Sequence, residues 1–405
     1  MNAPAAPDPA AIAAAVAGLD WWFDGMRIGG PFPGYGGPVV HWWNHCLAYQ
    51  GAGLDWRYEG IVAGYLTLWR RFGDRSWLDK ARRAGDDLVA GQLPDGHFRN
   101  SGFERNPGTG GTPHEVAADV ALLLLAQALA GAADPAAARY LAAARANLEA
   151  FAFGQLWHAP TATLWDAPGA VGFVPNKAAT FAEATMLLAA ATGDDALVER
   201  YAVPTAERIV GLQIRRFGDP LDGAIAQNVL GTRVVEKYFP LYIARCVPAL
   251  LQVAERTGQT RFRDAAVAAA RFLVRIREPD GGFPQVLYPR GRRNRYPRWI
   301  AGQGDIVRAL SLVAAEGAPV SADATVAWIL GGTRPDGRIA TANGFGRVVP
   351  GRGRRDRFAD EVGVVGWCDK AFRALAAITD RSPTESDATF AAPVPTPRVV
   401  AGVVR

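Results

Sequence analysis

A turn that comes back six times is the sequence feature that most constrains how this chain folds. Five Asp-Gly pairs recur along the chain: Asp24-Gly25, Asp95-Gly96, Asp222-Gly223, Asp280-Gly281 and Asp336-Gly337. The related sequence Trp165-Asp166-Ala167 fills the one gap in this series. Each copy follows a helix-like segment, and most copies precede a Gly/Pro-rich loop and another helix. A unit of roughly 55–70 residues with two helices cannot bury its apolar face alone, so neighbouring units must stack. Six helical hairpins therefore predict an all-α fold that closes into a ring.

Apolar periodicity and helix stop signals divide the chain into twelve predicted helices. These span residues 9–23, 55–72, 76–91, 114–130, 135–153, 177–191, 194–213, 236–256, 260–277, 302–315, 321–330 and 360–378. Short turns such as Gly73-Asp74 join the helices within a pair, and long Gly-rich loops join one pair to the next. All long loops should therefore lie at one end of the ring, and the first helix should pair with the last. In repeat folds the end that carries the insertions is often the binding face.

The bulk properties indicate one large domain. We predict a single domain over residues 1–380 and a Pro/Ser/Thr-rich tail over residues 381–405. Hydrophobic residues make up 49% of the chain, enough for a large core, but no apolar run reaches the ~18–20 residues of a membrane span. The N-terminus has no basic segment before its alanine stretch, which predicts a cytoplasmic protein with no membrane partner. Three cysteines, odd in number and far apart, do not indicate a disulfide framework.

The net charge of +5 is modest, but arginines are concentrated in two loops. One loop contains Arg290, Arg292, Arg293, Arg295 and Arg298, and the other contains Arg347, Arg352, Arg354, Arg355 and Arg357. Such loops can bind nucleic acid or an anionic small molecule, or they can simply be a solvated surface. We expect a small-molecule substrate rather than nucleic acid. The oligomeric state stays open.

A recurring motif resembles that of known repeat families. Gln92-Leu93-Pro94-Asp95-Gly96-His97-Phe98 is similar to the Q-x-x-D-G-x-aromatic motif of the squalene cyclase and prenyltransferase repeat families. Glu278-Pro279-Asp280-Gly281-Gly282-Phe283 is similar, with Arg277 or Glu278 in the place of glutamine. The helix–turn–helix rhythm also resembles the six-hairpin glycosidases, polysaccharide lyases and glucuronyl epimerases. The resemblance implies a double-ring (α/α)6 toroid over about residues 9–378. Because one fold can carry many functions, the resemblance does not by itself determine the activity.

Motifs that would select one of these families are missing. Class II terpene cyclases need D-x-D-D, which the chain lacks. The zinc-binding toroids need Cys, His or Asp ligands. Cys46 and Cys368 with one of His41, His45 or His114 could supply three ligands, but the flanking motifs of the lanthionine cyclases are absent. We therefore predict no metal and no cofactor.

The resemblance places the candidate catalytic residues at one end of the inner ring. In such toroids the helices that follow the long loops form the inner ring, and their first turns face the mouth. Each predicted inner helix begins with at least one acid, accompanied by aromatic or basic residues. A first-turn carboxylate also gains ~0.3–1 kcal/mol from the helix dipole and can cap free N–H groups, so position alone does not establish catalysis. The catalytic candidates are His114, Glu115, Asp305, Glu361 and Glu236, with Tyr58 and Tyr238 as lesser ones.

Substrate-binding candidates come mainly from the loops. Trp42, Trp43, Trp367 and Tyr288 would form an aromatic platform, and Arg298 and Arg347 would meet a carboxylate or phosphate. His45 and Lys237 complete this set. Paired carboxylates suit glycoside hydrolysis. A proton donor or acceptor beside a neutralised uronate carboxylate suits elimination or epimerisation.

We predict a carbohydrate-active enzyme: a glycoside or unsaturated-uronide hydrolase, a lyase or an epimerase. An isoprenoid cyclase or prenyltransferase is the main alternative, because aromatic faces also stabilise cations. That alternative predicts a cavity lined by aromatic and aliphatic side chains with one buried acid. A third hypothesis is a non-catalytic toroid that binds an anionic partner through the arginine loops.

Overall fold

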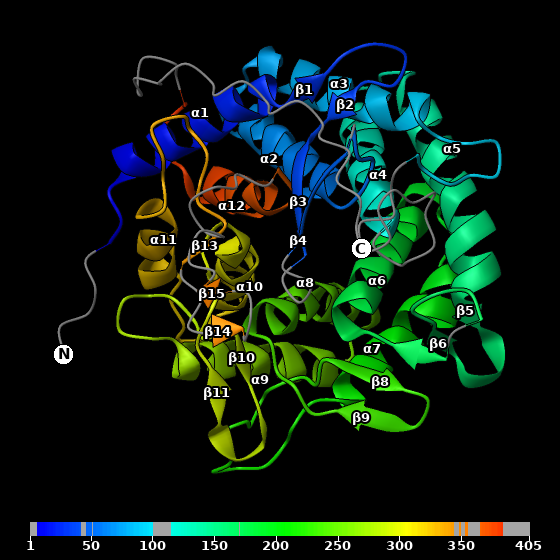
Figure 1. The fold of residues 1–405 in the computed structure, drawn as a ribbon. Helices are drawn as coiled ribbons and strands as arrows, with labels where there is room; N and C mark the ends of the chain where they lie inside the picture. The colour runs from blue at the N-terminus through cyan, green and yellow to red at the C-terminus, as the bar shows by residue number, and fades with distance from the viewer. Residues whose placement is uncertain are drawn as a thin grey trace.

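The computed structural model describes residues 6–41, 46–50, 52–99, 115–169, 171–343, 348–349, 353–354 and 365–383. Helices dominate these residues, with short two- and three-stranded sheets between them (Figure 1). The α-helices are α1 Pro9–Gly25, α2 Arg57–Phe72, α3 Arg75–Ala90, α4 Val116–Gly131, α5 Ala137–Asn147, α6 Pro175–Thr192, α7 Val203–Gly211, α8 Pro240–Thr257, α9 Thr260–Ile276, α10 Gly304–Ala315, α11 Asp323–Leu330 and α12 Val365–Ile378. Short helices of other types are η3 Leu148–Leu156, η4 Ala159–Thr161, η5 Val198–Ala202, η6 Pro289–Gly291 and η7 Ala301–Gln303.

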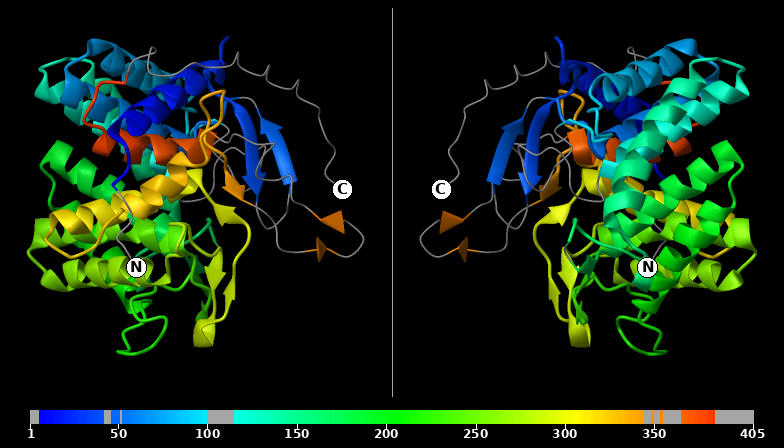
Figure 2. Two further views of the ribbon diagram at one scale, coloured as in Figure 1. Left: turned by 90° about the vertical axis from the view of Figure 1, so that its left-hand side faces the viewer. Right: turned by 90° about the vertical axis from the view of Figure 1, so that its right-hand side faces the viewer.

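The strands are short and pair antiparallel. They are β1 Arg27–Ile28, β2 Gly34–Tyr35, β3 Gly37–His41, β4 Cys46–Gln50, β5 Trp157–His158, β6 Thr163–Leu164, β7 Gly172–Phe173, β8 Asn228–Leu230, β9 Arg233–Val235, β10 Val286–Leu287, β11 Arg293–Asn294, β12 Arg298–Trp299, β13 Ala342–Asn343, β14 Val348–Val349 and β15 Gly353–Arg354. Strands β7, β8 and β9 form one sheet, and every other sheet has two strands. Figure 2 shows β3, β4 and the β10–β11 hairpin projecting from one end of the helical body. The predicted grouping of long loops at one end agrees with this view.

The helices form two concentric rings. The inner ring consists of α2, α4, α6, α8, α10 and α12, and each packs on the next in chain order. Helix α12 packs on α2, which closes the ring, and α1 packs on α12 from outside. Each remaining outer helix packs on the inner helix that precedes it in the chain. The predicted all-α (α/α)6 toroid, with the first helix paired to the last, is confirmed.

Four of the five Asp-Gly pairs form turns that join neighbouring repeats, whereas Asp24-Gly25 is the end of helix α1. The four turn glycines have left-handed backbones, with φ of 90° at Gly96, 89° at Gly223, 88° at Gly281 and 83° at Gly337. A Cβ at each would collide with a backbone oxygen of the next outer helix: Ala146 in α5, Ala268 in α9, Ala324 in α11 and Gly18 in α1. Only glycine can adopt the left-handed backbone and also leave room for the backbone oxygen of the neighbouring helix without strain. The contact of Gly337 with α1 connects the last full copy to the first helix, so the same turn that stacks the repeats also closes the circle.

The glutamine of the repeated motif has a structural role. Gln92 Nε2 donates to the carbonyl oxygens of Gly96 (3.0 Å) and Ala143 (2.8 Å). Gln213 Nε2 donates in the same way to Gly223 (3.0 Å) and Ala265 (2.9 Å). In both copies the amide ties the turn to the following outer helix. The motif shared with the cyclase and prenyltransferase repeats is thus explained by ring assembly, without reference to a substrate.

Several predicted helix boundaries were wrong. Helix α8 begins at Pro240 rather than at residue 236, because proline fits the first helical turn and lacks the N–H that later positions need. Glu236, Lys237 and Tyr238 therefore precede the helix. The first turns of α6 and α8 contain no acid, so the expectation of an acid at the start of every inner helix was wrong. Asp360 and Glu361, expected to begin the last helix, lie outside the described residues. Helix α5 ends at Asn147 and continues as the π-helix η3.

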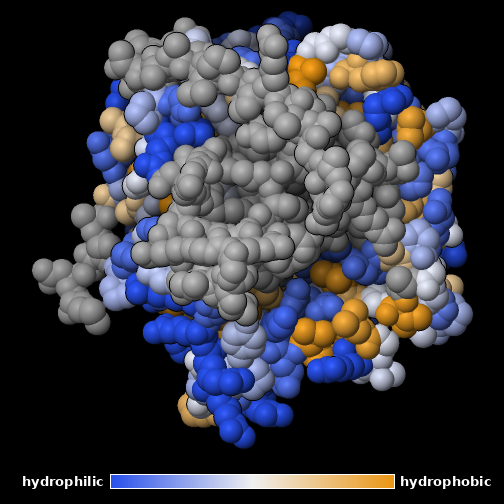
Figure 3. Space-filling model, viewed as in Figure 1, coloured by the Kyte–Doolittle hydropathy of each residue, from blue (hydrophilic) through white to orange (hydrophobic). Residues whose placement is uncertain are grey.

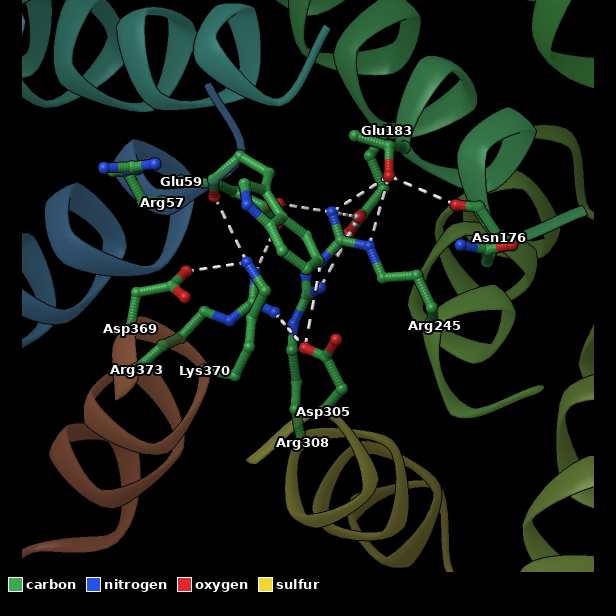
Figure 4. Close-up of polar contacts among 12 residues, drawn as sticks. Arg57, Glu59, Asn176, Glu183, Arg245, Asp305, Arg308, Asp369, Lys370 and Arg373 are labelled. Carbon is green, nitrogen blue, oxygen red and sulfur yellow. Dashed lines mark hydrogen bonds and ion pairs between the residues drawn. The ribbon is translucent and has the colours of Figure 1, made fainter. Parts of the chain in front are cut away.

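Glycines bring three inner helices unusually close. A Cβ at Gly60 of α2 would collide with Asp369 of α12, and a Cβ at Gly304 of α10 would collide with the backbone of Lys370. Helix α12 therefore packs closely between α2 and α10. Its charged residues Asp369, Lys370 and Arg373 point toward the axis of the ring (Figure 4). No helix in the described part of the chain is long and apolar enough to cross a membrane.

Candidate functional site

Three tryptophans form a row where the inner helices begin, at the end that carries the long loops. We call Trp56, Trp299 and Trp367 the aromatic wall. The rings of Trp299 and Trp367 are stacked, with centroids 4.9 Å apart and planes at 26°. Trp56 meets Trp367 edge-on, with centroids 4.8 Å apart and planes at 75°. The three residues come from the start of α2, from β12 and from the first turn of α12, so the wall forms only when the ring closes.

A narrow slot beside this wall contains buried polar atoms that lack partners. Its lining includes Phe239, Tyr242, Phe283, Gln285, Gln303, Trp299 and Trp367. Its volume of about 10 Å³ has room for about one water molecule, so these side chains form a wall rather than an enclosed chamber. Within the described residues, Gln285 Nε2, Gln303 Oε1 and Trp367 Nε1 have no hydrogen-bond partner. The three residues are 3%, 1% and 5% exposed, and buried polar atoms left unpaired at such exposure are costly unless a ligand or water completes them.

A layer of ion pairs fills the centre of the ring (Figure 4). We call it the ion-pair layer; it consists of Glu59, Glu183, Asp305, Arg245, Arg308 and Arg373. Glu59 pairs with both Arg245 and Arg373, and Arg373 also pairs with Asp305. Arg308 Nη2 lies 2.6 Å from Glu183 Oε1. These side chains converge from α2, α6, α8, α10 and α12, so the layer links five of the inner helices.

The neighbouring charges keep Glu59 and Arg245 in their ionised forms. Burial opposes the negative charge of Glu59, but the neighbouring charges of Arg245 and Arg373 outweigh it and hold the pKa of Glu59 well below its usual range. The surrounding acids raise the pKa of Arg245, although burial opposes this. Because Glu59 stays ionised, its role is electrostatic rather than that of a proton donor.

Asp369 and Lys370 lie between the ion-pair layer and the aromatic wall. Lys370 Nζ donates to Asp369 Oδ2 (2.6 Å) and to the carbonyl oxygen of Trp56 (3.2 Å), and it lies 5.1 Å from the centre of a Trp56 ring. Burial raises the pKa of Asp369 to about 7, although the charge of Lys370 acts in the opposite direction. A carboxyl group with a pKa near neutrality can both accept and donate a proton under ordinary conditions.

Glu115 is buried and binds the preceding Asp-Gly turn. Its Oε1 accepts hydrogen bonds from the backbone N–H of Phe98 (2.7 Å) and from Asn147 Nδ2 (3.0 Å). Both of its carboxylate oxygens lie 3.0 Å from His97 Nδ1, and this contact raises the pKa of His97. Asp119, one turn further along α4, is fully buried with no partner for its carboxyl oxygens among the described residues, and burial raises its pKa well above the usual range.

The two tyrosine candidates are buried in the packing of the rings. The Tyr58 hydroxyl donates to Asp87 Oδ2 (3.2 Å) and accepts from the backbone N–H of Tyr35 (3.3 Å), and burial raises its pKa well above the usual value. Tyr238 exchanges backbone hydrogen bonds with Leu287, and burial raises the pKa of its hydroxyl to about 12.

The other described candidates lie in the loops. Glu236 and Lys237 are exposed before α8, and Tyr288 is half-buried in the β10–β11 hairpin. Arg298 Nη1 and Nη2 bind the two carboxylate oxygens of Asp280 at 2.7 and 2.5 Å, and the guanidinium lies 4.2 Å from the centre of a Trp328 ring. Arg298 therefore stabilises an Asp-Gly turn. The arginines nearest the tip of the hairpin, Arg290, Arg292 and Arg293, are exposed, and Figure 3 shows hydrophilic side chains over this region at the lower edge of the molecule.

The structure thus brings together only part of the predicted set. Trp367 lies in the aromatic wall and Asp305 in the ion-pair layer, whereas the other described candidates lie around them. His114, Glu361, Trp42, Trp43, His45 and Arg347 lie outside the described residues. Cys368, considered above as a metal ligand, is fully buried and its Sγ donates to the carbonyl oxygen of Ile339 (3.3 Å). Over the described ranges, no three His, Cys, Asp or Glu side chains converge in a way that could hold a metal ion.

Sequence reasoning missed the residues at the centre. Arg245, Arg308, Arg373 and Lys370 lie on inner helices, each facing the axis, but they stand one to three turns beyond the helix starts. Charged residues at inward positions of otherwise apolar helices were the available signal. The search of the first turns alone could not find them.

Comparison with solved structures supports the architecture. The chain is similar to an unsaturated glucuronyl hydrolase responsible for the degradation of glycosaminoglycan from Bacillus sp. GL1, with a TM-score of 0.59, 15% identity and coverage of 93% of this chain and 97% of that one. It is also similar to the cellobiose 2-epimerase of Bacillus thermoamylovorans, with a TM-score of 0.62, 11% identity and coverage of 87% and 95%. A D-mannose isomerase matches with a TM-score of 0.63, 11% identity and coverage of 90% and 96%.

These likenesses, all at low identity, show the (α/α)6 toroid fold. No protein-family model matches the chain, and no curated protein sequence is significantly similar to it.

Proposed function

We propose that the protein is a carbohydrate-active enzyme that binds an acidic sugar against the aromatic wall. The observation that carries this proposal is the set of unpartnered polar atoms on Gln285, Gln303 and Trp367 between aromatic side chains. A sugar presents apolar C–H faces that pack on flat indole rings, and hydroxyl groups that can donate and accept hydrogen bonds. Sites for small molecules typically combine apolar walls with a few buried polar groups in this way.

The charges near the wall favour an anionic substrate. Arg245, Arg308, Arg373 and Lys370 contribute four positive charges, against the carboxylates of Glu59, Glu183 and Asp305. Asp369 is partly protonated near neutral pH because burial raises its pKa to about 7. The centre therefore carries a small net positive charge, which stabilises a nearby carboxylate in a site of low dielectric constant.

The proposed chemistry is proton transfer to or from the sugar. Hydrolysis of an unsaturated uronide, elimination and epimerisation each require a group that gains or loses a proton beside a carboxylate or carbonyl. Asp369 is the described carboxyl group best suited to exchange protons near neutral pH, and Lys370 orients it. His114, Glu115 and Glu361 stay predictions for the second acid or base. The structural neighbours include a hydrolase, an epimerase and an isomerase, each acting on sugars by its own name, which supports this range.

The alternative of an isoprenoid cyclase fits the described centre less well. It predicts an apolar cavity with one buried acid, whereas six charged side chains meet on the axis of this ring. Burying so many charges is costly unless they are paired, and a cavity for an isoprenoid chain does not require them.

A substrate panel tests the proposal. Unsaturated uronic acid disaccharides are followed by loss of the ultraviolet absorbance of their conjugated double bond. Intact uronate oligosaccharides are followed by its appearance, and free sugars and uronates by deuterium uptake from D₂O in NMR spectra. We expect turnover in one of these assays. Failure of all three, with no sugar binding detectable by calorimetry, would overturn the proposal.

The variant Trp367→Phe tests the site itself. It keeps an aromatic ring but removes the unpartnered Nε1–H donor. We expect kcat/KM to fall about tenfold, since a hydrogen bond to a ligand is worth about 1–1.5 kcal/mol. Trp77→Phe, at a buried tryptophan of outer helix α3, is the matched control and should leave kcat/KM unchanged. Equal activity of the two variants would exclude the wall from the site.

A further inference from the structure

A second cavity opens at the opposite end of the ring. We call it the rear cavity; it has a volume of about 320 Å³. Its lining residues come from α2, α4, α10 and α12, and they include Thr67, Arg70, Ala377 and Ile378 near the C-terminal ends of α2 and α12. The aromatic wall lies at the N-terminal ends of the same helices. The rear cavity is therefore separate from the proposed sugar site.

The walls of the rear cavity are mostly apolar. They consist of Leu66, Val120, Leu124, Val307, Leu312 and Ile378, with Ala63, Ala374 and Ala377 between them. Leu66, Val120, Val307 and Ala374 are buried, whereas Leu312 at the rim is 38% exposed. A volume of this size lies at the lower end of the range for small-molecule sites, and moving an alkyl chain from water onto such walls is favourable.

Three side chains of the ion-pair layer line the inner end of the rear cavity. Arg308 and Arg373 line it together with Glu59, which is already paired with two arginines. The Arg308 side chain is 22% exposed, more than any other member of the ion-pair layer, and both of its Nη atoms donate to Glu183. Arg373 Nε is buried and has no hydrogen-bond partner among the described residues. The inner end therefore combines a partly exposed guanidinium with an unused buried donor, both of which a further acceptor group could use.

A third arginine stands in the lining near the end of α2. Arg70 is exposed and makes no ion pair with any residue that the structure describes. The charged residues that line the rear cavity are thus three arginines and one acid, Glu59, between apolar walls. Arg308 and Arg373 are paired within the ion-pair layer, so Arg70 contributes the positive charge that no described acid balances.

We propose that the rear cavity binds an aliphatic carboxylate of medium chain length, with its carboxylate at Arg308 and its chain along the walls. Because Arg308 already binds Glu183 through both Nη atoms, the ligand carboxylate would share this guanidinium with Glu183 and would also be attracted by Arg70. The alkyl chain matches the leucine and valine lining. A neutral alcohol of equal length would gain the apolar contacts but not the ion pair. This site would lie on the other side of the ion-pair layer from the aromatic wall, and the two sites would share the charge of Arg308 and Arg373.

Calorimetry with sodium octanoate tests the proposal on the full chain, with 1-octanol as the neutral probe. We expect octanoate to bind with one site per chain and at least tenfold more tightly than octanol. Arg308→Gln should weaken octanoate binding about tenfold or more and leave octanol binding unchanged. Ala377→Phe, which places a ring in the cavity, should abolish the binding of both probes.

Two further variants keep the test decisive if a central substitution impairs folding. Arg70→Gln changes an exposed residue and should weaken octanoate binding severalfold. Arg145→Gln, on the outer surface in an exposed pair with Glu149, should have no effect. Absence of octanoate binding to the wild type, or equal binding by wild type, Arg70→Gln and Ala377→Phe with intact circular dichroism, would overturn the proposal. Octanoate binding is measured directly and without sugar, so failure of the proposed sugar activity would not bear on this result.

Discussion

Asp369 is a fully buried carboxyl group beside a buried lysine, and its protonation should be visible in the stability of the protein. Burial raises its pKa to about 7 in the folded state, whereas an unfolded aspartate has a pKa near 3.9. Between about pH 4 and pH 7 the folded chain therefore holds a proton that the unfolded chain has lost. The contribution of this group is fully present below about pH 4 and is lost as the pH rises toward 7.

The variant Asp369→Asn isolates this effect. We expect the free energy of unfolding of the wild type, minus that of the variant, to fall as the pH rises from about 5 to 7, by at most about 1.4 kcal/mol per unit. The difference should level off above about pH 7. Urea unfolding at a series of pH values measures it. A difference that is constant or that rises over this range would contradict the assignment.

Glu59 is the acid on which the ion-pair layer depends most. Its carboxylate pairs with Arg245 and Arg373, and its side chain is 1% exposed. Glu59→Gln leaves two buried guanidinium groups short of a counter-charge, so we expect a loss of about 3–5 kcal/mol in the free energy of unfolding. Glu149→Gln removes an exposed pair with Arg145 and should cost less than about 1 kcal/mol. Similar losses in both variants, measured by urea unfolding, would mean that the layer adds little stability.

At the scale of elements, the Asp-Gly turns are the joints between repeats. Gly337 has a φ of 83°, and a Cβ there would collide with the backbone of Gly18 in α1. Gly218 has almost the same φ, 82°, but a Cβ there would meet nothing within 4 Å. An alanine at either position would have the same backbone strain, but only an alanine at position 337 would also collide with a neighbouring helix.

The paired variants Gly337→Ala and Gly218→Ala test this role. The left-handed backbone should cost each variant about 1–2 kcal/mol of unfolding free energy. Gly337→Ala must in addition push α1 from the turn, which should cost about 1–3 kcal/mol more. Urea unfolding of the two variants gives the comparison. Equal losses would show that the contact between the last turn and the first helix is not tight.

The same turns explain how far the sequence could predict the elements. Asp-Gly pairs and apolar periodicity predict the twelve helices, because both depend on local backbone demands. The start of α8 was misplaced because polar residues before Pro240 can also begin a helix. The ion-pair layer was missed because Arg245 and Arg373 meet across the ring, and no local pattern specifies which inward residues face one another.

At the scale of the whole molecule, α1 completes the outer ring by covering α12 and α11. Its residues Ile12, Val16, Leu19 and Phe23 are buried, and it packs on α12 and α11. Removal of residues 1–25 would expose the outer face of α12 and leave the turn at Gly337 without its partner. The ring is therefore expected to unfold as a unit rather than to open at one joint.

Deletion of residues 1–25 tests this expectation. We expect the deleted variant to lose the cooperative thermal unfolding transition, or to bind an apolar dye strongly at temperatures below that transition. Either result would follow because the deletion exposes the apolar outer face of α12. Deletion of residues 1–6 alone, which retains the capping residue Asp8, should leave the transition unchanged. A sharp, unshifted transition in the longer deletion would mean that the circle of helices does not depend on its first member.

The ion-pair layer also determines from which side a sugar could reach the aromatic wall. The toroid is obstructed midway along its axis, so no strand can thread from one side to the other. A bound saccharide must enter and leave through the end of the ring that carries the aromatic wall, with either its reducing or its non-reducing end first. Every sugar unit that reaches the aromatic wall, whether free or part of a chain, must therefore be bound from that side of the layer.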